Sequence, residues 1–435
     1  MSEEEKFDCI IVGAGPAGLS AALTLAKAGV EVAVLERGEY PGSKNVMGGI
    51  LFTTILDKLL PEFWKQAPVE RHVTHRRFAV LSKDGEAAFD FKTSAFNEPP
   101  YNHTWTVLRA KFDRWYAEQV EAAGAMIIPG MMVSEALLED GRVVGVKTEP
   151  GGDELRCDVV ISAEGANSFL AEQVGLRKPH DAKHMAVAVK EVIGLSRETI
   201  EDRFQLNNNE GSAYEVFGHA VQGTFGSGFV YTNKDSLSIG IGATIHDMTR
   251  HNLNPNDVLE QFKKHPSIAP LIRGGESLEY AAHMIPEGGY LHLPKLVTGG
   301  MILTGDAAGL VNASHYHEGS NLAMASGVLA AETVIAAKEK GDFSESSLAI
   351  YRQKLEDSFV LKDLKKFQKF SQFLIDNPHM LRDYPDVMVA LLRDYFTISE
   401  KPKVQIEKEV LAKFKREIGL FALVKDLYKT WRAMR

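Results

Sequence analysis

The sequence predicts an α/β fold that combines a unit with a parallel sheet, a unit with an antiparallel sheet, and a helical C-terminal region. Three observations support this prediction. Residues 7–37 have the order strand, glycine turn, helix, strand. Residues 184–245 contain alternating and aromatic runs that are typical of antiparallel strands. Residues 345–435 are helical in pattern and become increasingly basic.

A glycine-rich turn at residues 13–18 follows the apolar run 9–12 and opens a helix. In its pattern, G-x-G-x-x-G, the first glycine permits a sharp turn, the second leaves room for a pyrophosphate against bare backbone, and the third lets the helix lie close to the strand. The amides and the dipole at the N-terminus of the helix favour phosphate at the same place. The predicted dinucleotide-binding residues of this turn are Gly13, Gly15, Pro16, Ala17 and Gly18.

An acidic residue ends the second predicted strand. Glu36 follows the apolar run 30–35 and lies 18 residues after Gly18, close to the spacing of about 20 expected for the acid that binds a ribose hydroxyl. A glutamate at this position favours NAD or FAD over NADP. Arg37 comes next and belongs to the predicted site. A glycine turn without a ligand is the alternative, but every element of the required context is present.

The composition is that of an ordinary globular chain of 435 residues with a net charge of −9. This charge argues against nucleic-acid binding, because neutralising phosphates requires a basic face. Residues 1–5 are acidic, unlike a signal peptide, and no apolar run approaches a membrane span, so we expect a cytoplasmic protein. Cys9 and Cys157 lie in separate strand-like runs, where we expect buried core residues and no metal or iron–sulfur site.

Three further places have the character of cofactor contacts. Arg109 begins a helix and can donate to a ribityl or phosphate oxygen, with a surface salt bridge as the alternative. Residues 163–168 and 304–309 form two more glycine turns at strand ends. An aspartate in the last turn can accept ribityl hydroxyls, and the helix from about 318 to 337 offers its N-terminal amides to a reduced flavin. The candidates are Glu164, Gly165, Gly305, Asp306, Gly319 and Asn321.

These motifs, in this order, resemble those of the FAD-containing, p-hydroxybenzoate-hydroxylase-like flavoproteins. The resemblance covers residues 1 to about 340 and rests on the turn at 13–18 with Glu36, on Arg109, and on the two later turns. It implies FAD as the cofactor and a Rossmann-like FAD-binding domain assembled from separated segments. Glu164 stands where the family usually has an aspartate, an acid of the same charge.

The loop after Glu36, residues 37–49, contains several glycines and a proline, which predicts an extended segment. In a flavoprotein of this kind the loop would run past the flavin ring. Lys44 and Asn45 are then candidates to hydrogen-bond the flavin or to tune its potential, and Gly48 joins the predicted cofactor contacts. The alternative is that these are solvated loop residues.

Later stretches resemble the electron-transfer-flavoprotein:quinone oxidoreductases, and among them the bacterial FixC type. They are residues 42–49, 285–290, 294–296, 318–324, 362–367 and 377–378. The resemblance implies an enzyme that takes electrons from a two-subunit electron transfer flavoprotein and reduces a membrane quinone. Mitochondrial relatives carry a [4Fe–4S] cluster in a cysteine-bearing extension. The lack of such cysteines here fits the FixC type, which implies a separate ferredoxin-like iron–sulfur subunit and electron bifurcation from NADH to quinone and to ferredoxin or flavodoxin.

Quinone reduction requires protons as well as electrons. His315 and His317 lie between the Asp306 turn and the helix predicted to face the flavin, so they are candidate proton donors or quinone contacts. Lys44 is a third catalytic candidate. The alternative is that the histidines brace their loop.

The C-terminal stretch 411–435 has a net charge of +5, from seven basic and two acidic residues. Leu420, Leu423, Val424, Leu427 and Trp431 fall on one helical face, with Lys425, Lys429 and Arg432 across from it. Such a helix can rest on an anionic membrane surface or dock on a partner, which would place the protein peripherally on the cytoplasmic membrane. Packing on its own protein is the alternative.

Two other functions stay open. A geranylgeranyl-reductase-like enzyme that saturates prenyl chains would share the general plan, and a flavin-containing docking subunit would have no substrate of its own. The predicted domain ranges are 1–75, 104–180 and 285–340 for FAD binding, 76–103 and 181–284 for the substrate or quinone side, and 341–435 for the helical C-terminal region.

Overall fold

The computed structural model describes residues 6–44 and 48–434, which form two compact units. The first unit takes the described chain as far as Glu70 and then His103–Met185 and Met284–Lys365. The second unit consists of Arg71–Asn102, Ala186–His283 and the described chain from Lys366 onward. The C-terminal stretch 341–435 is thus divided between the two units.

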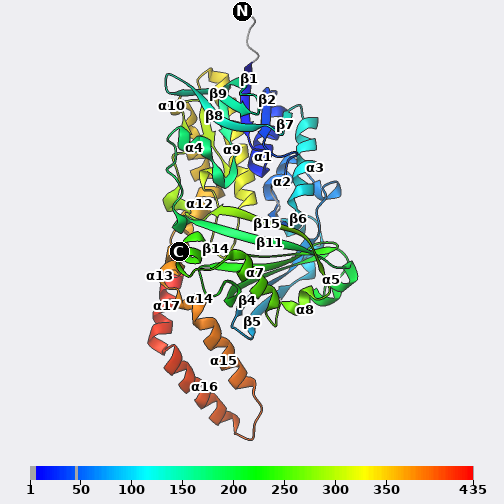
Figure 1. Cartoon of the computed structure of the whole chain (residues 1–435), viewed down its shortest axis with the longest axis vertical. Helices are drawn as coiled ribbons and strands as arrows, with labels where there is room; N and C mark the ends of the chain where they lie inside the picture. Colours follow the sequence, from blue (N-terminus) through cyan, green and yellow to red (C-terminus); the bar gives the residue numbers. More distant parts are fainter. Residues whose placement is uncertain (1–5, 45–47, 435) are drawn as a thin grey trace, which may run out of the picture. The chain divides into compact units, whose positions relative to one another are not determined.

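A mostly parallel sheet organises the first unit (Figure 1). Its strands are β1 (Lys6–Val12), β2 (Val32–Glu36), β7 (Met126–Pro129), β8 (Met132–Glu139), β9 (Arg142–Glu149), β10 (Glu154–Ser162), β16 (Val297–Thr298) and β17 (Met301–Leu303). The order is β16-β17-β10-β1-β2-β7, with β9 on β10 and β8 on β9. The five strands from β17 to β7 are parallel, and Ile10 and Ile11 are fully buried, as expected where both faces of a sheet are covered. The predicted Rossmann-like α/β arrangement is confirmed.

Cys9 and Cys157 lie in neighbouring strands of this sheet and are buried free thiols, as predicted. Burial raises the pKa of Cys157 to about 12. Both side chains therefore act as small core residues.

The first unit contains several helices, and the longest of them, α9, is mostly buried. They are α1 (Pro16–Lys27), α2 (Thr54–Leu59), α3 (Arg109–Ala122), α4 (Phe169–Gln173), α9 (Ser320–Lys340), α10 (Glu345–Leu348), α11 (Ile350–Asp357) and α12 (Phe359–Lys366), with 3₁₀ turns η1 (Phe63–Lys65), η4 (Gly165–Asn167), η5 (Ala182–His184), η7 (Tyr290–His292) and η8 (Gly305–Ala308). Within the described chain, α9 alone is long and apolar enough to cross a membrane, but 67% of its apolar window is buried inside the protein. It packs closely on α1 as a core helix.

One predicted boundary is wrong. The loop predicted over 37–49 ends earlier, because β3 (Gly48–Phe52) begins at Gly48 and pairs antiparallel with β6 (Thr104–Leu108). The glycines in this stretch suggested a loop, but a strand partner more than fifty residues away fixes the backbone instead.

The second unit contains a sheet in which β11, β14, β13 and β12 are antiparallel in turn (Figure 1). Its strands are β4 (His72–Leu81), β5 (Glu86–Lys92), β11 (Met185–Gly194), β12 (Glu210–Gly218), β13 (Gly226–Thr232), β14 (Ser236–Thr244) and β15 (Glu276–Pro286). The order of the strands in this unit is β15-β11-β14-β13-β12-β4, and β5 pairs antiparallel with β4 off this path, whereas β12 and β4 are parallel. The predicted antiparallel sheet is confirmed, whereas β15 and the full length of β4 were not predicted.

Helices cover part of this sheet and form the C-terminal end of the chain. They are α5 (Arg197–Phe204), α6 (Ile245–Arg250), α7 (Pro255–Lys264), α8 (Ala269–Ile272), α13 (Phe370–Asp376), α14 (His379–Arg382), α15 (Tyr384–Phe396), α16 (Lys403–Glu417) and α17 (Leu420–Ala433), with 3₁₀ turns η2 (Ser94–Asn97), η3 (Tyr101–His103) and η6 (His219–Val221). Val258, Leu259 and Phe262 of α7 pack into the core of the sheet. Helices α15 and α16 lie side by side (Figure 1).

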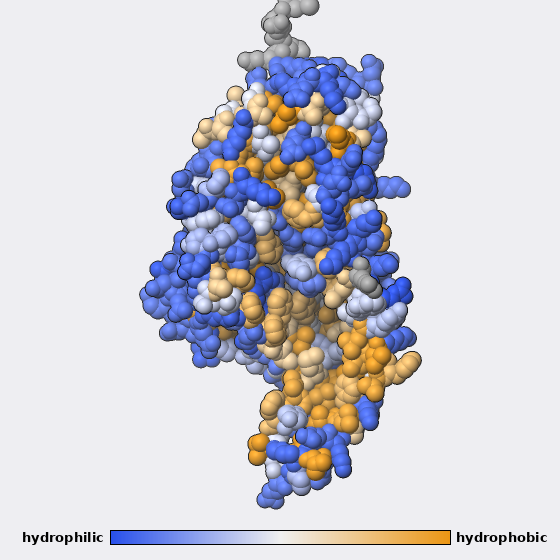
Figure 2. All heavy atoms as spheres, turned by 180° about the vertical axis from the view of Figure 1, so that it is seen from behind, coloured by the Kyte–Doolittle hydropathy of each residue, from blue (hydrophilic) through white to orange (hydrophobic). Residues whose placement is uncertain are grey.

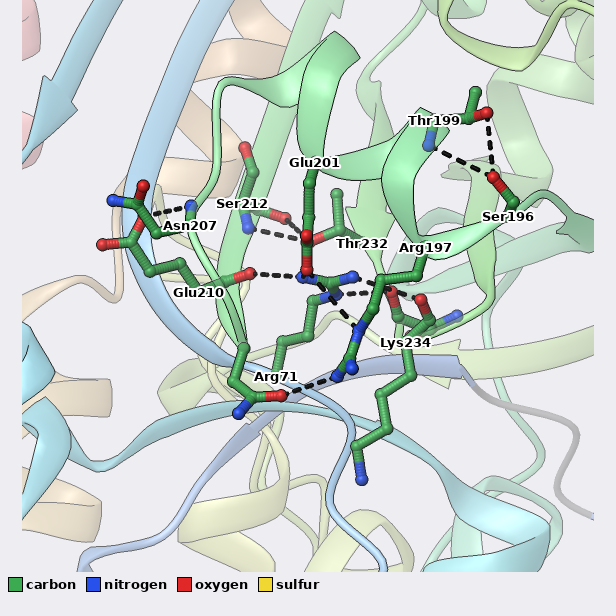
Figure 3. A network of polar contacts seen from close by, with 12 residues as sticks. Arg71, Ser196, Arg197, Thr199, Glu201, Asn207, Glu210, Ser212, Thr232 and Lys234 are labelled. Carbon is green, nitrogen blue, oxygen red and sulfur yellow. Dashed lines mark hydrogen bonds and ion pairs between the residues drawn. The ribbon is translucent and has the colours of Figure 1, made fainter.

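A buried arginine ties several loops of the second unit together (Figure 3). The Arg71 side chain is fully buried and donates to the carbonyl oxygens of Asn233 at 2.6 Å, of Glu210 at 3.1 Å and of Lys234 at 3.1 Å. Its guanidinium also forms an ion pair of 3.0 Å with Glu201 of α5. One cation therefore satisfies three loop carbonyls and a carboxylate, which fixes the ends of β12 and β14 to α5.

We expect Arg71→Met to destabilise the protein by about 3–5 kcal/mol, because it leaves three buried carbonyl oxygens without their donor and removes the shorter of the two ion pairs of Glu201. Arg197→Met is the matched control. The Arg197 side chain is 41% exposed and lies 3.6 Å from the same Glu201, so its loss costs less than about 1 kcal/mol. Urea denaturation followed by circular dichroism measures both, and equal losses would contradict the assignment.

Candidate cofactor site

The first glycine turn has the backbone that its sequence predicted. Gly13 has φ +104°, and a Cβ there would lie 2.5 Å from the carbonyl oxygen of Ala163 at the end of β10. A Cβ on Gly18 would lie 2.0 Å from the carbonyl oxygen of Gly13. These two glycines are thus required by the protein itself, because no side chain fits at either position.

Two other glycines have no such internal reason. Gly15 and Gly319 are the N-cap residues of α1 and α9, with φ −84° and −130°. A Cβ on either would meet nothing within 4 Å. Outside residues 45–49, every other described glycine with this much open space has a positive φ, which explains the glycine without a ligand. The bare backbone at these two helix ends is therefore suited to close approach by a bound group, and anions are favoured there.

Tight packing brings the two helix ends to the same region of the first unit. A Cβ on Gly327 of α9 would lie 2.1 Å from the carbonyl oxygen of Ala17 in α1, and one on Gly305 of η8 would lie 3.0 Å from the Ala17 Cβ. Ser326 of α9 fixes the third turn, since its Oγ accepts from the Gly305 backbone N–H at 3.0 Å and lies 2.7 Å from Thr304 Oγ1. The predicted residues Ala17, Gly305 and Gly319 thus lie on elements that are packed together.

Glu36 lies at the carboxyl end of β2 and folds back over the first turn. Its carboxylate accepts from the backbone N–H groups of Ala14 at 3.0 Å and Gly38 at 2.7 Å. This position beside the turn suits an acceptor for ribose hydroxyls. Arg37 and Lys44 are exposed, and Asn45 lies outside the described residues.

Arg109 forms a buried ion pair, so the alternative of a surface salt bridge is wrong. The side chain is 5% exposed and donates from Nε and a terminal nitrogen to Asp113 of α3, at 2.6 Å in each case. Burial raises the pKa of Asp113; Arg109 opposes this shift, and Glu36 adds to it. Sequence reasoning missed Asp113, although its spacing of four residues from Arg109 on a helix could have revealed the pair.

Asp306 is electrostatically coupled to the same arginine. Burial raises the pKa of Asp306, and Arg109 lowers it. The buried guanidinium of Arg109 therefore offsets part of the negative charge of Asp113 and Asp306. Glu36 adds a further negative charge that acts on Asp113. In this arrangement, carboxylate oxygens can accept hydrogen bonds from hydroxyl groups, and a guanidinium can donate hydrogen bonds to a phosphate.

Two predicted residues have their polar groups engaged within the protein. The Glu164 carboxylate accepts from Ser162 at 2.7 Å and from Ser168 at 3.2 Å, and burial raises its pKa. Asn321 accepts from Thr54 at 2.8 Å and donates to Glu318 at 3.0 Å. Both side chains brace the turns on which they lie. Gly165 beside Glu164 has φ +73° and open space around it.

The two candidate histidines lie on a loop between η8 and α9 whose two ends are joined by backbone hydrogen bonds. The backbones of Asn312 and Glu318 pair across its base, with hydrogen bonds of 2.8 and 3.1 Å. His315 is half-buried, with its ring 4.3 Å from that of Tyr316. His317 is exposed and has φ +45°, which is unusual for a residue other than glycine. The loop thus presents imidazoles next to the elements that carry Asp306 and Gly319.

Comparisons with known proteins agree over nearly the whole chain. Family models match residues 6–207 (FAD binding domain), residues 186–285 (ETF-QO, ubiquinone-binding) and residues 370–435 (ETF-QO/FixC family C-terminal domain). Protein FixC of Bradyrhizobium diazoefficiens is 44% identical over 99% of this chain and 100% of the relative. The probable electron transfer flavoprotein-quinone oxidoreductase YdiS of Escherichia coli K12 is 44% identical over 97% of this chain and 98% of the relative.

Solved structures share the fold at low sequence identity. A geranylgeranyl bacteriochlorophyll reductase-like protein from Thermoplasma acidophilum aligns with TM-score 0.73 and 20% identity, covering 98% of this chain and 99% of that one. The myxobacterial halogenase CndH, a FAD-dependent enzyme, aligns with TM-score 0.64 and 19% identity, covering 99% and 97%. The FAD-binding model over residues 6–207, together with the FixC relatives, confirms FAD as the cofactor, and the bare helix ends, the acceptors and the buried arginine fit it.

We expect Gly15→Val to weaken FAD binding by about 1–3 kcal/mol, because the new side chain fills space beside the α1 N-terminus that the cofactor needs. The cofactor-free protein should keep its thermal stability, since nothing of the protein lies within 4 Å. Gly18→Ala is the contrast, because it clashes with Gly13 and should lower stability even without FAD. Titration calorimetry with FAD and thermal unfolding measure both effects. A destabilised Gly15→Val apoprotein would contradict this reading.

Proposed function

The chain belongs to the ETF-QO/FixC family of FAD-dependent oxidoreductases, and on that premise we propose that it passes electrons from a two-subunit electron transfer flavoprotein to a quinone. One observation carries the proposal: a region matched by the family's ubiquinone-binding model, residues 186–285, follows on the FAD-binding scaffold in one chain. FAD supplies the two-electron transfer that joins a flavoprotein donor to a quinone acceptor.

The chain's own residues bind the cofactor and handle protons. In this proposal Gly15 and Gly319 admit the cofactor to the ends of α1 and α9, and Glu36 and Asp306 accept its hydroxyl groups. Arg109 offsets the charge of Asp113 and Asp306 and is the donor that we propose for a phosphate or ribityl oxygen. His315 and His317, on the loop beside α9, donate protons to the quinone oxygens, with Lys44 as a further candidate.

We infer a complex with separate electron-transfer partners. The two cysteines of the chain are buried and free, so an iron–sulfur centre on the same route would be carried by a ferredoxin-like subunit. The full-length similarity to proteins called FixC supports the FixC type, and that type implies this assembly. In it, electrons from NADH divide between quinone and ferredoxin or flavodoxin.

The C-terminal helix α17 supports peripheral membrane contact on the cytoplasmic side. Its outward face is apolar: Phe421 is 84% exposed, and the same face carries Leu420, Val424, Leu427, Tyr428 and Trp431, each more than half exposed. Figure 2 shows hydrophobic side chains gathered over the C-terminal helices. An exposed apolar helix face with flanking lysines and arginines fits the interface of an anionic bilayer.

Polar side chains hold the opposite face of α17 on the protein. Asp426 is 5% exposed; His379 Nε2 lies 2.9 Å from its carboxylate, and Tyr384 donates to it. Burial would raise the pKa of Asp426, but these hydrogen bonds lower it. Lys429 donates to Asn377 at 2.9 Å. Because the helix turns polar groups inward and apolar groups outward, its apolar face is not needed for packing within the chain. Leu423, which was predicted on that face, is half-buried.

Quinone-dependent oxidation of the bound cofactor tests the proposed function. The holoenzyme is reduced anaerobically with dithionite and mixed with a short-chain quinone while the flavin absorbance is recorded. We expect rapid, stoichiometric reoxidation and no reduction of the oxidised protein by NADH alone. Reoxidation by an unsaturated prenyl lipid but not by quinones would favour the prenyl reductase. Reoxidation by neither would favour a docking subunit.

Vesicle flotation tests the membrane contact. We expect Phe421→Glu to weaken binding to anionic vesicles tenfold or more, because a buried Phe side chain contributes about 1.5–3 kcal/mol and the new charge is repelled. Phe169→Glu is the matched control, since Phe169 is 68% exposed but lies on α4. Reoxidation by a water-soluble quinone should be unchanged in both variants. Equal flotation of Phe421→Glu and the parent protein would exclude α17 as the contact.

A further inference from the structure

The two faces of the sheet in the second unit differ in character. One face consists of buried apolar side chains that pack against α7, among them Val216, Val230 and Ile239. Because side chains alternate along a strand, the residues next to these belong to the opposite face. That face carries aromatic side chains that are only partly buried. They are Phe78 of β4, Phe217 of β12, and Phe229 and Tyr231 of β13.

Two hydrogen-bond donors lie on this aromatic face with a small residue between them. Ala213 of β12 is in register with Arg76 of β4 on one side and with Tyr231 of β13 on the other. Since neighbouring strands lie about 4.8 Å apart, the backbones at Arg76 and Tyr231 are roughly 10 Å apart. The residue between them contributes only a methyl group, so the strand order itself places an arginine and a tyrosine on either side of a low point of the face.

A buried glutamate orients Arg76. The guanidinium donates to Glu215 of β12 at 2.9 Å, and the Glu215 side chain is only 2% exposed. The other terminal nitrogen of Arg76 has no acceptor among the described residues. Arg77, the next residue along β4, faces the opposite side of the sheet and forms ion pairs with Glu86 and Asp90. Arg76 thus differs from its neighbour, because it keeps a donor for a further acceptor.

The ring of Tyr231 is held in place, whereas its hydroxyl group is not. The ring stacks on that of Phe229, with centroids 4.7 Å apart, and Phe229 lies over Gly240, where a Cβ would lie 2.5 Å from its Cζ. No hydrogen bond within the described part of the chain holds the hydroxyl. Burial raises the pKa of Tyr231 and Glu215 adds to this shift, whereas Arg76 opposes it. The hydroxyl therefore stays protonated and can donate.

We propose that Arg76 and Tyr231 bind the head group of the quinone, in which each donates a hydrogen bond to an oxygen of the quinone ring. This inference rests on the proposed function and adds the residues that recognise the acceptor. A quinone ring is flat and presents carbonyl oxygens, which suits two donors beside aromatic side chains. Tyr231 lies within residues 186–285, which the ubiquinone-binding model matches, whereas Arg76 lies outside that range.

Binding of ubiquinone-1, a short-chain quinone, to the oxidised holoenzyme tests this subsite by equilibrium dialysis. We expect Tyr231→Phe and Arg76→Lys each to raise the dissociation constant about 3- to 10-fold, because each variant loses a hydrogen bond to the quinone. In Arg76→Lys the single amino group stays with Glu215 and cannot serve both acceptors. Arg77→Lys is the matched control, since it makes the same change one residue away on the opposite face, and it should bind ubiquinone-1 as the parent does.

The FAD content and the thermal unfolding midpoint of each variant are measured alongside. Tyr231→Phe keeps the ring that stacks on Phe229, so it decides the question even if Arg76→Lys does not fold. If the parent does not bind ubiquinone-1, the proposed function fails together with the subsite. If the parent binds it and Tyr231→Phe binds it equally well, only the subsite fails. Loss of FAD with unchanged binding of ubiquinone-1 would assign these donors to the cofactor and would also overturn the proposal.

Discussion

The contact between α1 and α9 is the constraint on which the rest of the site depends. Gly327 of α9 approaches the Ala17 carbonyl so closely that no side chain fits, and Ser326 binds the turn before Asp306. The N-terminal ends of two helices are thereby directed to one region, each beginning with a glycine that faces open space. A phosphate-bearing, electron-rich cofactor is favoured there by both helix dipoles.

Charge balance follows from that geometry. Asp113 and Asp306 share the field of the buried Arg109, and Glu36 lies close enough to raise the pKa of Asp113. Carboxylates without this cation would repel one another and resist burial. The arginine therefore lets the protein keep several acceptors for hydroxyl groups in one place.

The features that the sequence predicted correctly are those that a local sequence pattern determines. The apolar run before Gly13 and the acid at Glu36 predicted strand, turn and helix, because backbone conformation and spacing are encoded within some thirty residues. Arg109 was found, but its partner Asp113 was overlooked. Strand β15 was missed because an edge strand with mostly exposed side chains has no clear alternation of apolar residues.

We infer that FAD occupies the open space beside Gly15 and Gly319. An experimental structure of the holoenzyme tests it most directly. We predict that the pyrophosphate lies within hydrogen-bonding distance of the backbone N–H groups at the start of α1 and that the flavin ring lies against the start of α9. Density for FAD that leaves both glycines facing solvent would contradict the account.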